Sequence, residues 1–300
     1  MCNVANSPVS AGDWTVFLFF EFLNVVGFLL NICLLVTVAK DRQFRSPTFI
    51  LISSLAVADT WHNYYTATYF YPPIVTRQNP YPKWLYLTLN CLDWTAWGVT
   101  VTHMVALALD RYLAIAKFST YKQLVSRRRI VTFVGVVWSV EFIFGVCLAA
   151  TNACCPMCPV PEQWTFDFEK REKNNKPNYY EVLFMPQEIV GTVSLIVLSI
   201  LTITRWRQKS RRSSITNISS QLDRKIYLQI GLILLVFTLY ILAYYLSNHI
   251  LGTDGYNKGI TLFNSLLYNF SNMINPVIYF AINGSLRDSF AEILCCCRVK

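Results

Sequence analysis

Several ionisable residues of this chain lie within long runs of apolar residues. Asp93 precedes Arg111 by eighteen positions, a separation of ~27 Å along an α-helix. A charged side chain inside a membrane costs several kcal/mol unless it meets a partner or water, so each such residue is a candidate for a functional site. The Asp93 carboxylate suits a cationic ligand group near one end of its helix, or else an internal pair with Asn269 or Lys258.

A second polar group combines carboxylate, hydroxyl and amide oxygens at comparable depths in different runs. Asp59 lies in the run Leu55-Ala56-Val57-Ala58-Asp59, and its expected neighbours are Asn31, Thr100, Ser271, Asn272 and Asn275. These oxygens suit a small hard cation such as sodium, together with water. The alternative is a hydrogen-bonded cluster that only joins helices.

Two further polar pairs are predicted from the positions of their members. His103 and Glu141 both lie at the middle of neighbouring runs, and we expect a hydrogen bond between them. Arg111 is flanked by Asp110, and Asp223 begins a later run on the same side. An Arg111–Asp223 ion pair would hold the resting state, and breaking it would expose a cavity to a cytoplasmic partner. The alternative is an ordinary interfacial ion pair.

Seven runs are long enough to be the membrane helices that position these residues. The chain is 54% hydrophobic and 14% charged, with a mean hydropathy of +0.38, and a bilayer needs ~20 apolar residues per helix. A soluble helical bundle would interrupt the runs with a polar face. We therefore predict an all-α membrane protein, a seven-transmembrane helix bundle. Its spans are 14–39, 48–71, 84–116, 130–152, 182–204, 226–250 and 260–282.

The basic residues alternate from side to side of the predicted membrane. Most of the 26 Lys and Arg residues fall in three alternate loops and in the C-terminal tail. This excess marks the cytoplasmic face, so the net charge of +9 does not imply nucleic-acid binding. We expect an extracellular N-terminus over 1–13 without a cleaved signal peptide, a membrane domain over 14–282, and a cytoplasmic end over 283–300.

The C-terminal segment predicts a short eighth helix on the inner leaflet. Leu286, Phe290, Ile293 and Leu294 form one apolar stripe at helical spacing, and the segment is too short and too charged to span. Three adjacent cysteines follow and are candidates for palmitoylation: Cys295, Cys296 and Cys297.

Ordered motifs along the chain resemble those of rhodopsin-like (class A) G-protein-coupled receptors. They are Asn31, Leu55-Ala56-x-x-Asp59, Asp110-Arg111-Tyr112, Trp138, Pro186, Phe237, Asn275-Pro276-x-x-Tyr279 and Leu286-Arg287-x-x-Phe290. The resemblance covers nearly the whole chain. It implies a plasma-membrane receptor that couples to a heterotrimeric G protein, with arrestin and a kinase as further partners.

The resemblance also implies roles for single residues. Arg111 would contact the G protein, and Tyr279 would swing inward on activation. Asp59, Thr100, Asn272 and Asn275 would form a sodium and water site, and we expect no other cofactor. The sequence departs from the family in the sixth span, where Ile241 and Ala243 replace the usual tryptophan and proline.

The disulfide pattern departs from the family as well. Tyr86 stands in place of the usual outer cysteine of the third span. Cys91, five residues deeper, could pair with Cys154, Cys155 or Cys158, and the sequence leaves the choice open.

The expected ligand site surrounds Asp93, which matches the carboxylate that amine receptors use. Its predicted members are Asp93, Trp94, Trp97, Tyr244, Tyr245 and Asn269. Aromatic faces suit a cation, and the long charged outer loop favours a short peptide with a basic or amidated end. A chemosensory ligand or a biogenic amine is the alternative within the same fold. A transporter is disfavoured because no internal repeat is found in the sequence. The sequence also shows no pair of catalytic residues, so we do not predict an enzyme.

Overall fold

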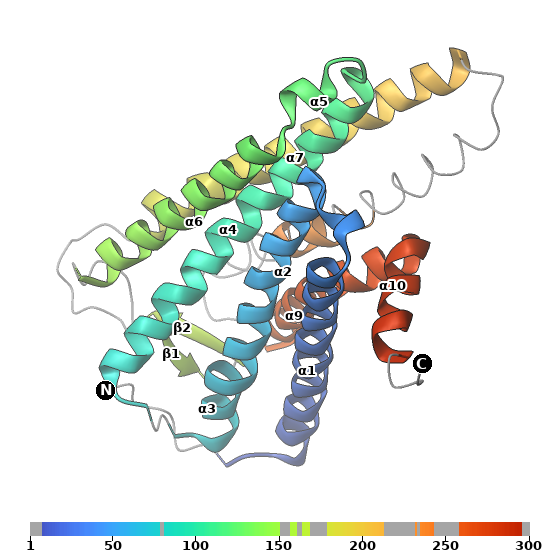
Figure 1. Ribbon diagram of the computed structural model, residues 1–300. Helices are drawn as coiled ribbons and strands as arrows, with labels where there is room; N and C mark the ends of the chain where they lie inside the picture. The colour runs from blue at the N-terminus through green and yellow to red at the C-terminus, as the bar shows by residue number, and fades with distance from the viewer. Residues whose placement is uncertain are drawn as a thin grey trace.

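A computed structural model describes residues 8–78, 81–150, 157–160, 164–168, 179–212, 232, 235–242 and 258–295. Long helices dominate it (Figure 1). They are α1 (Ala11–Lys40), α2 (Pro47–Tyr65), α3 (Tyr71–Thr76), α4 (Lys83–Ala116), α5 (Tyr121–Leu124), α6 (Arg127–Ala150), α7 (Tyr179–Arg212), α9 (Lys258–Ile282) and α10 (Gly284–Cys295). Residues 235–242 are also helical. The strands β1 (Met157–Val160) and β2 (Thr165–Phe168) pair antiparallel in the predicted outer loop.

The first helix begins at a local signal in the sequence. Ser10 and Asp13 form a capping box, in which the Ser10 hydroxyl accepts from the Asp13 backbone N–H at 3.1 Å. The Asp13 carboxylate in turn accepts from the Ser10 backbone N–H at 3.0 Å. These bonds satisfy backbone groups that a helix start leaves open, so α1 begins at Ala11, three residues before the predicted span.

The second predicted span does not end at residue 71. A π-helical stretch, η2 (Thr66–Phe70), joins α2 directly to α3, which continues to Thr76. Pro72 and Pro73 lack backbone N–H donors, and such breaks in the hydrogen-bond ladder are where wider turns occur. The extension carries Tyr71 and Arg77 to the outer end of the bundle.

The helices pack around α4, which contacts α2, α6 and α7, while α1 packs against α2 and α9 (Figure 1). Large apolar side chains face outward on α1 and α7: Leu18 and Phe22 are each 63% exposed and Val190 is 65% exposed. Polar side chains such as Asn31, Asp59 and His62 are fully buried. An apolar exterior around a polar interior is the arrangement a bilayer requires.

Four of the described helices are long and apolar enough to cross a membrane by length and composition alone. They are Ala11–Lys40, Trp84–Ala116, Arg127–Cys147 and Pro186–Gln208. The remaining long helices, α2 and α9, carry the interior polar residues, which lower their mean hydropathy. Asp59, His62 and Asn63 are buried on α2, and Asn269, Asn272 and Asn275 are buried on α9.

The short helix α10 follows α9 at an angle (Figure 1). The Ser289 hydroxyl donates to the Asp41 carboxylate at 2.7 Å, which ties α10 to the segment after α1. This bond and the Gln43 backbone N–H lower the pKa of Asp41. On the apolar side, the Phe290 ring lies 5.2 Å from that of Phe280. The predicted amphipathic helix therefore exists, with its polar side docked on the first turn between helices.

Candidate functional site

Asp93 is held inside the bundle by a residue that the sequence prediction did not consider. His62 Nδ1 lies 2.8 Å from Asp93 Oδ1 and 2.9 Å from the Tyr268 hydroxyl. The alternative reading of Asp93, an internal pair, is therefore found, but with His62 and not with Asn269 or Lys258, the two examples named. Asn269 donates to the Tyr71 hydroxyl at 2.5 Å, and Lys258 is bound to Asp13. His62 lies three residues after Asp59 on the same helix face, a spacing that could have revealed it.

Trp97 lies at the centre of an aromatic cluster below Asp93. Its ring is 6.1 Å from Phe237, 5.5 Å from Tyr240 and 6.2 Å from both Tyr268 and His62. Its indole N–H donates to Glu188 on α7 at 2.7 Å. Trp97 thus contacts α2, α7, α9 and the 235–242 helix, so a shift of any of these helices moves its neighbours.

Asp59 lies in the next polar layer and is fully buried. Asn275 donates to its Oδ2 at 2.8 Å, and the Asn31 amide donates to the Asn272 carbonyl at 3.0 Å. These bonds join α2 to α9 and α1 to α9. The layer therefore unites the three helices whose motifs were predicted to meet.

The Asp59 layer also contains polar atoms that lack protein partners among the described residues. They are Asp59 Oδ1, Thr100 Oγ1, Asn31 Oδ1 and Asn272 Nδ2. A cavity of about 10 Å³ lies beside Thr100 and Asn272, and its lining combines Ser271 and Asn275 with the apolar residues Met104, Val236, Phe237 and Ile274. That volume is close to what one water molecule needs. Carboxylate, hydroxyl and amide oxygens are atom types that a small hard cation binds, and the sodium site at Asp59, Thr100, Asn272 and Asn275 stays a prediction.

The end of α4 that was predicted to face the cytoplasm holds Arg111 loosely. Its Nη2 lies 3.4 Å from Asp110 Oδ2, and its side chain is 24% exposed. Asp110 is buried and accepts two shorter bonds, from the Thr48 hydroxyl at 2.9 Å and from the Tyr121 hydroxyl at 2.6 Å. Burial and the bond to Asp110 raise the pKa of Tyr121 to about 12, so its hydroxyl stays neutral. Thr48 and Tyr121 were not singled out in the sequence.

The remaining residues that were predicted to take part in activation lie on α9 and α4. Tyr279 is buried on α9, and Pro276 lies inside that helix one residue after Asn275. Tyr112 is half-buried next to Arg111. Trp94, a predicted member of the ligand site, is half-buried and packs on the central apolar cluster.

The predicted bond between His103 and Glu141 does not form. His103 Nδ1 bonds to the Val99 carbonyl of its own helix at 2.9 Å. Glu141 accepts instead from the Gln187 amide of α7 at 2.7 Å. Gly98 makes this arrangement possible, because a Cβ at position 98 would overlap the Glu141 carboxyl. Glu141 therefore connects α6 to α7 across α4.

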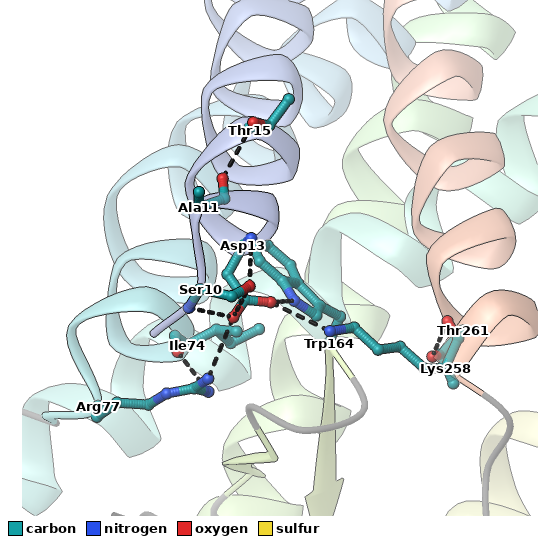
Figure 2. Close-up of polar contacts among 9 residues, drawn as sticks. All are labelled: Ser10, Ala11, Asp13, Thr15, Ile74, Arg77, Trp164, Lys258 and Thr261. Carbon is teal, nitrogen blue, oxygen red and sulfur yellow. Dashed lines mark hydrogen bonds and ion pairs between the residues drawn. The ribbon is translucent and has the colours of Figure 1, made fainter. Parts of the chain in front are cut away.

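A polar cluster at the outer mouth centres on Asp13 (Figure 2). Its carboxylate accepts from the Trp164 indole at 2.8 Å and from Lys258 Nζ at 3.1 Å, and lies 3.6 Å from Arg77 Nη2. Trp164 is fully buried at the start of β2, with a φ of 53° that few side chains adopt. We call Asp13, Arg77, Trp164 and Lys258 the outer clasp. The capping box signalled Asp13, but no local pattern predicted its distant partners.

Several predicted site residues lie outside the described part of the chain. They are Asp223, Tyr244, Tyr245, Cys154, Cys155, Cys296 and Cys297, and for Cys158 and Cys295 only the backbone is described. Cys91 forms no disulfide with any residue that the structure describes, and it lies against Gly145 of α6. Its disulfide, the Arg111–Asp223 pair and the lipid attachment stay predictions.

The fold and the site together define a helical membrane receptor with a polar interior and a cationic inner end. The family described as 7 transmembrane receptor (rhodopsin family) matches residues 30–279. The chain belongs to this family, and its seven-helix membrane fold confirms the prediction. It is a G-protein-coupled receptor of the plasma membrane, a class that responds to extracellular ligands.

Similar proteins carry two kinds of name. Lysophosphatidic acid receptor 1-A of Xenopus laevis is 23% identical over 293 residues, covering 91% of this chain and 73% of the relative. Lysophosphatidic acid receptor 1 of Homo sapiens is 23% identical over 291 residues, covering 90% and 73%. Neuropeptide receptor 22 of Caenorhabditis elegans is 24% identical over 299 residues, covering 91% and 68%.

Proposed function

We propose that this receptor binds a short peptide whose cationic group pairs with Asp93, with the N-terminus of the receptor facing the extracellular side. The single observation that carries the proposal is the partly exposed Asp93 carboxylate, whose side chain is 20% exposed beside buried aromatic rings. A carboxylate at the edge of an aromatic cluster binds cations through both charge and ring faces. A similar protein named as a neuropeptide receptor supports the peptide class.

The proposed signal passes through Trp97. A ligand that displaces Trp97 or Tyr268 shifts the rings of Phe237 and Tyr240, which lie on the 235–242 helix. Ile241 leaves that helix without the family's usual tryptophan, and Trp97 supplies an indole from α4 at this contact. The response ends at Arg111, which exchanges Asp110 for the G protein. A sodium ion held by Asp59, Thr100 and Asn275 would stabilise the resting arrangement.

Other ligand classes differ in the charge that they require. A biogenic amine or a chemosensory amine would use the same Asp93 carboxylate. A lysophospholipid, suggested by the names of two similar proteins, needs basic residues for its phosphate. Arg77 and Lys258 are basic, but both already face Asp13. Among the described residues no Lys or Arg contacts Asp93, which favours a cationic ligand.

A panel of peptides, amines and lysophospholipids on cells that express the chain tests the proposal, with coupling measured through several Gα chimeras. Asp93→Asn should weaken the potency of the active peptide by about tenfold or more, because a charge-assisted bond is lost. A lysophospholipid as the active compound, or an unchanged potency in Asp93→Asn, would contradict the proposal. Phosphorylation by a kinase, arrestin binding and lipidation of the tail are further proposed properties.

A further inference from the structure

The Asp93 carboxylate does not offer both of its oxygens equally to a ligand. Oδ1 is bonded to His62 Nδ1 at 2.8 Å. Among the residues that the structure describes, that is the hydrogen bond that Asp93 makes, which leaves Oδ2 for a ligand. His62 is fully buried, so its side chain cannot turn into solvent. A ligand at Asp93 therefore meets Oδ2 without a bond to any described residue, and Oδ1 with part of its acceptor capacity already used by His62.

The tautomer of His62 follows from its neighbours. A carboxylate oxygen only accepts hydrogen bonds, so Nδ1 carries the proton that points at Asp93. The Tyr268 hydroxyl, 2.9 Å from the same nitrogen, then cannot donate to it and presents its oxygen. The single Nδ1–H therefore lies between Asp93 Oδ1 on α4 and the Tyr268 oxygen on α9, with the charged carboxylate as the stronger acceptor. The bond to Oδ1 is a fixed part of the site.

Cationic groups differ in how many acceptor oxygens they use. A guanidinium is a planar fork whose parallel N–H groups bind both oxygens of one carboxylate. An ammonium is a compact charge with rotatable donors and needs a single oxygen. A carboxylate with one oxygen already bonded to an imidazole therefore still suits an ammonium. A guanidinium must compete with the imidazole for its second hydrogen bond.

Resting on the proposed cation site at Asp93, we infer that His62 is a specificity-determining residue that selects an ammonium group over a guanidinium. The ligand is then a peptide with a free amino terminus or an exposed lysine, or an amine, and does not present arginine to Asp93. His62 acts through Asp93 without touching the ligand, so it is a positioning residue for the recognising carboxylate.

The test compares two probes that share one aromatic body, 2-phenylethylamine and 2-phenylethylguanidine. Each is titrated against the purified full-length receptor in lipid nanodiscs, and the shift of the unfolding temperature gives its apparent Kd. The wild type should bind the amine about tenfold more tightly than the guanidine, the worth of roughly one charge-assisted hydrogen bond. Equal binding of both probes by the wild type would overturn the inference without any variant.

Variants of His62 locate the cause of the preference. His62→Leu frees Oδ1, so the guanidine should gain about tenfold and the preference should disappear. His62→Gln retains a side-chain donor and should preserve the preference. His103→Leu is the matched control, because His103 is also buried but bonds to the Val99 carbonyl, and its preference should equal that of the wild type. An unchanged preference in His62→Leu overturns the inference, and if that variant does not fold, the wild-type ratio and His62→Gln decide.

Failure of the underlying site gives a different result. If neither probe shifts the wild-type unfolding temperature, the cation site at Asp93 is wrong and this inference falls with it. If both probes shift it equally, and Asp93→Asn abolishes both shifts, the cation site stands and only the role of His62 is wrong.

Discussion

The two mouths of the bundle each centre on one buried carboxylate, but they surround it differently. At the outer mouth, Asp13 receives two cations and an indole N–H from segments far apart in the chain. At the opposite mouth, which we propose faces the cytoplasm, Asp110 receives two neutral hydroxyl groups and lies 3.4 Å from Arg111. The Asp13 carboxylate is occupied by partners from different elements of the fold. The inner one is satisfied by neutral donors, so Arg111 remains available for another partner.

This difference separates a structural use of charge from a signalling use. The Asp13 carboxylate is buried, so separating the elements that it joins would leave a buried charge without partners, which costs several kcal/mol. A cation beside a carboxylate that hydroxyl groups already satisfy can leave at a lower cost. The outer clasp therefore resists movement, and the Arg111 end permits it.

The largest expected effect is at the inner mouth. Arg111→Ala should abolish agonist-driven nucleotide exchange on the G protein, while agonist affinity changes by less than about tenfold. Exchange and radioligand binding are measured on the same membranes. Arg129→Ala is the control, because that guanidinium donates to the Gln123 and Leu124 carbonyls of the adjacent loop. Full coupling by Arg111→Ala would contradict the signalling role of Arg111.

The outer clasp should matter for stability first. Asp13→Ala leaves the Trp164 indole and two cations without their acceptor, so the free energy of unfolding should fall by about 2 kcal/mol. Thermal unfolding of the purified receptor measures this. Asp13→Asn keeps an acceptor for the indole and should lose less. If Asp13→Ala unfolds at the wild-type temperature, the outer clasp does not hold the mouth closed.

A smaller effect is expected from one hydroxyl group beside Asp110. Tyr121→Phe removes a donor, so Asp110 should hold Arg111 more strongly and basal nucleotide exchange should fall about threefold, the worth of one weak hydrogen bond. Tyr81→Phe is the matched control at the outer mouth, where the Tyr81 hydroxyl donates to the Thr68 carbonyl at 2.9 Å. Its basal exchange should not change. A rise in basal exchange in Tyr121→Phe would show that Tyr121 restrains Arg111 instead.

Salt should produce the smallest difference. Raising the ionic strength from 0.05 to 0.5 M weakens the partly exposed pairs of Asp13 by roughly 0.5 kcal/mol in total. The wild-type unfolding temperature should therefore fall more than that of Asp13→Asn over the same range. Asp110→Asn should follow the wild type, because hydroxyl groups supply its short bonds. Equal salt responses in the wild type and Asp13→Asn would mean that charge does not strengthen the outer clasp.

The sequence predicted the parts of this receptor that repeat at helical spacing. Apolar runs gave four of the described helices, α1, α4, α6 and α9, within three residues of their bounds, because burial in lipid imposes length and composition. The helix α7 extends eight residues beyond its predicted end at 204, and α2 continues through η2 and α3 to Thr76. The meeting of Asp59, Asn31, Asn272 and Asn275 was predictable because polar groups inside a membrane must find one another. The amphipathic stripe similarly predicted α10.

Pairings that depend on helix rotation were not predictable. His103 and Glu141 lie at similar depths, but each side chain points to a different neighbour, the Val99 carbonyl and the Gln187 amide. Depth follows from position in a run, whereas direction depends on how three helices pack. The bond from Trp164 to Asp13 joins residues 151 positions apart, and no local pattern carries that information.

Gly98 shows how a map of tolerated substitutions could mislead. Its position has room for a hydrogen atom, because the Glu141 carboxyl occupies the space of a Cβ. In a saturation library, alanine at this position would displace the Glu141 carboxyl, the far end of a flexible side chain, and disturb its bond to the Gln187 amide. A companion change that shortens Glu141 would restore tolerance there, and such paired rescue separates residues that fill space from residues that transmit signals.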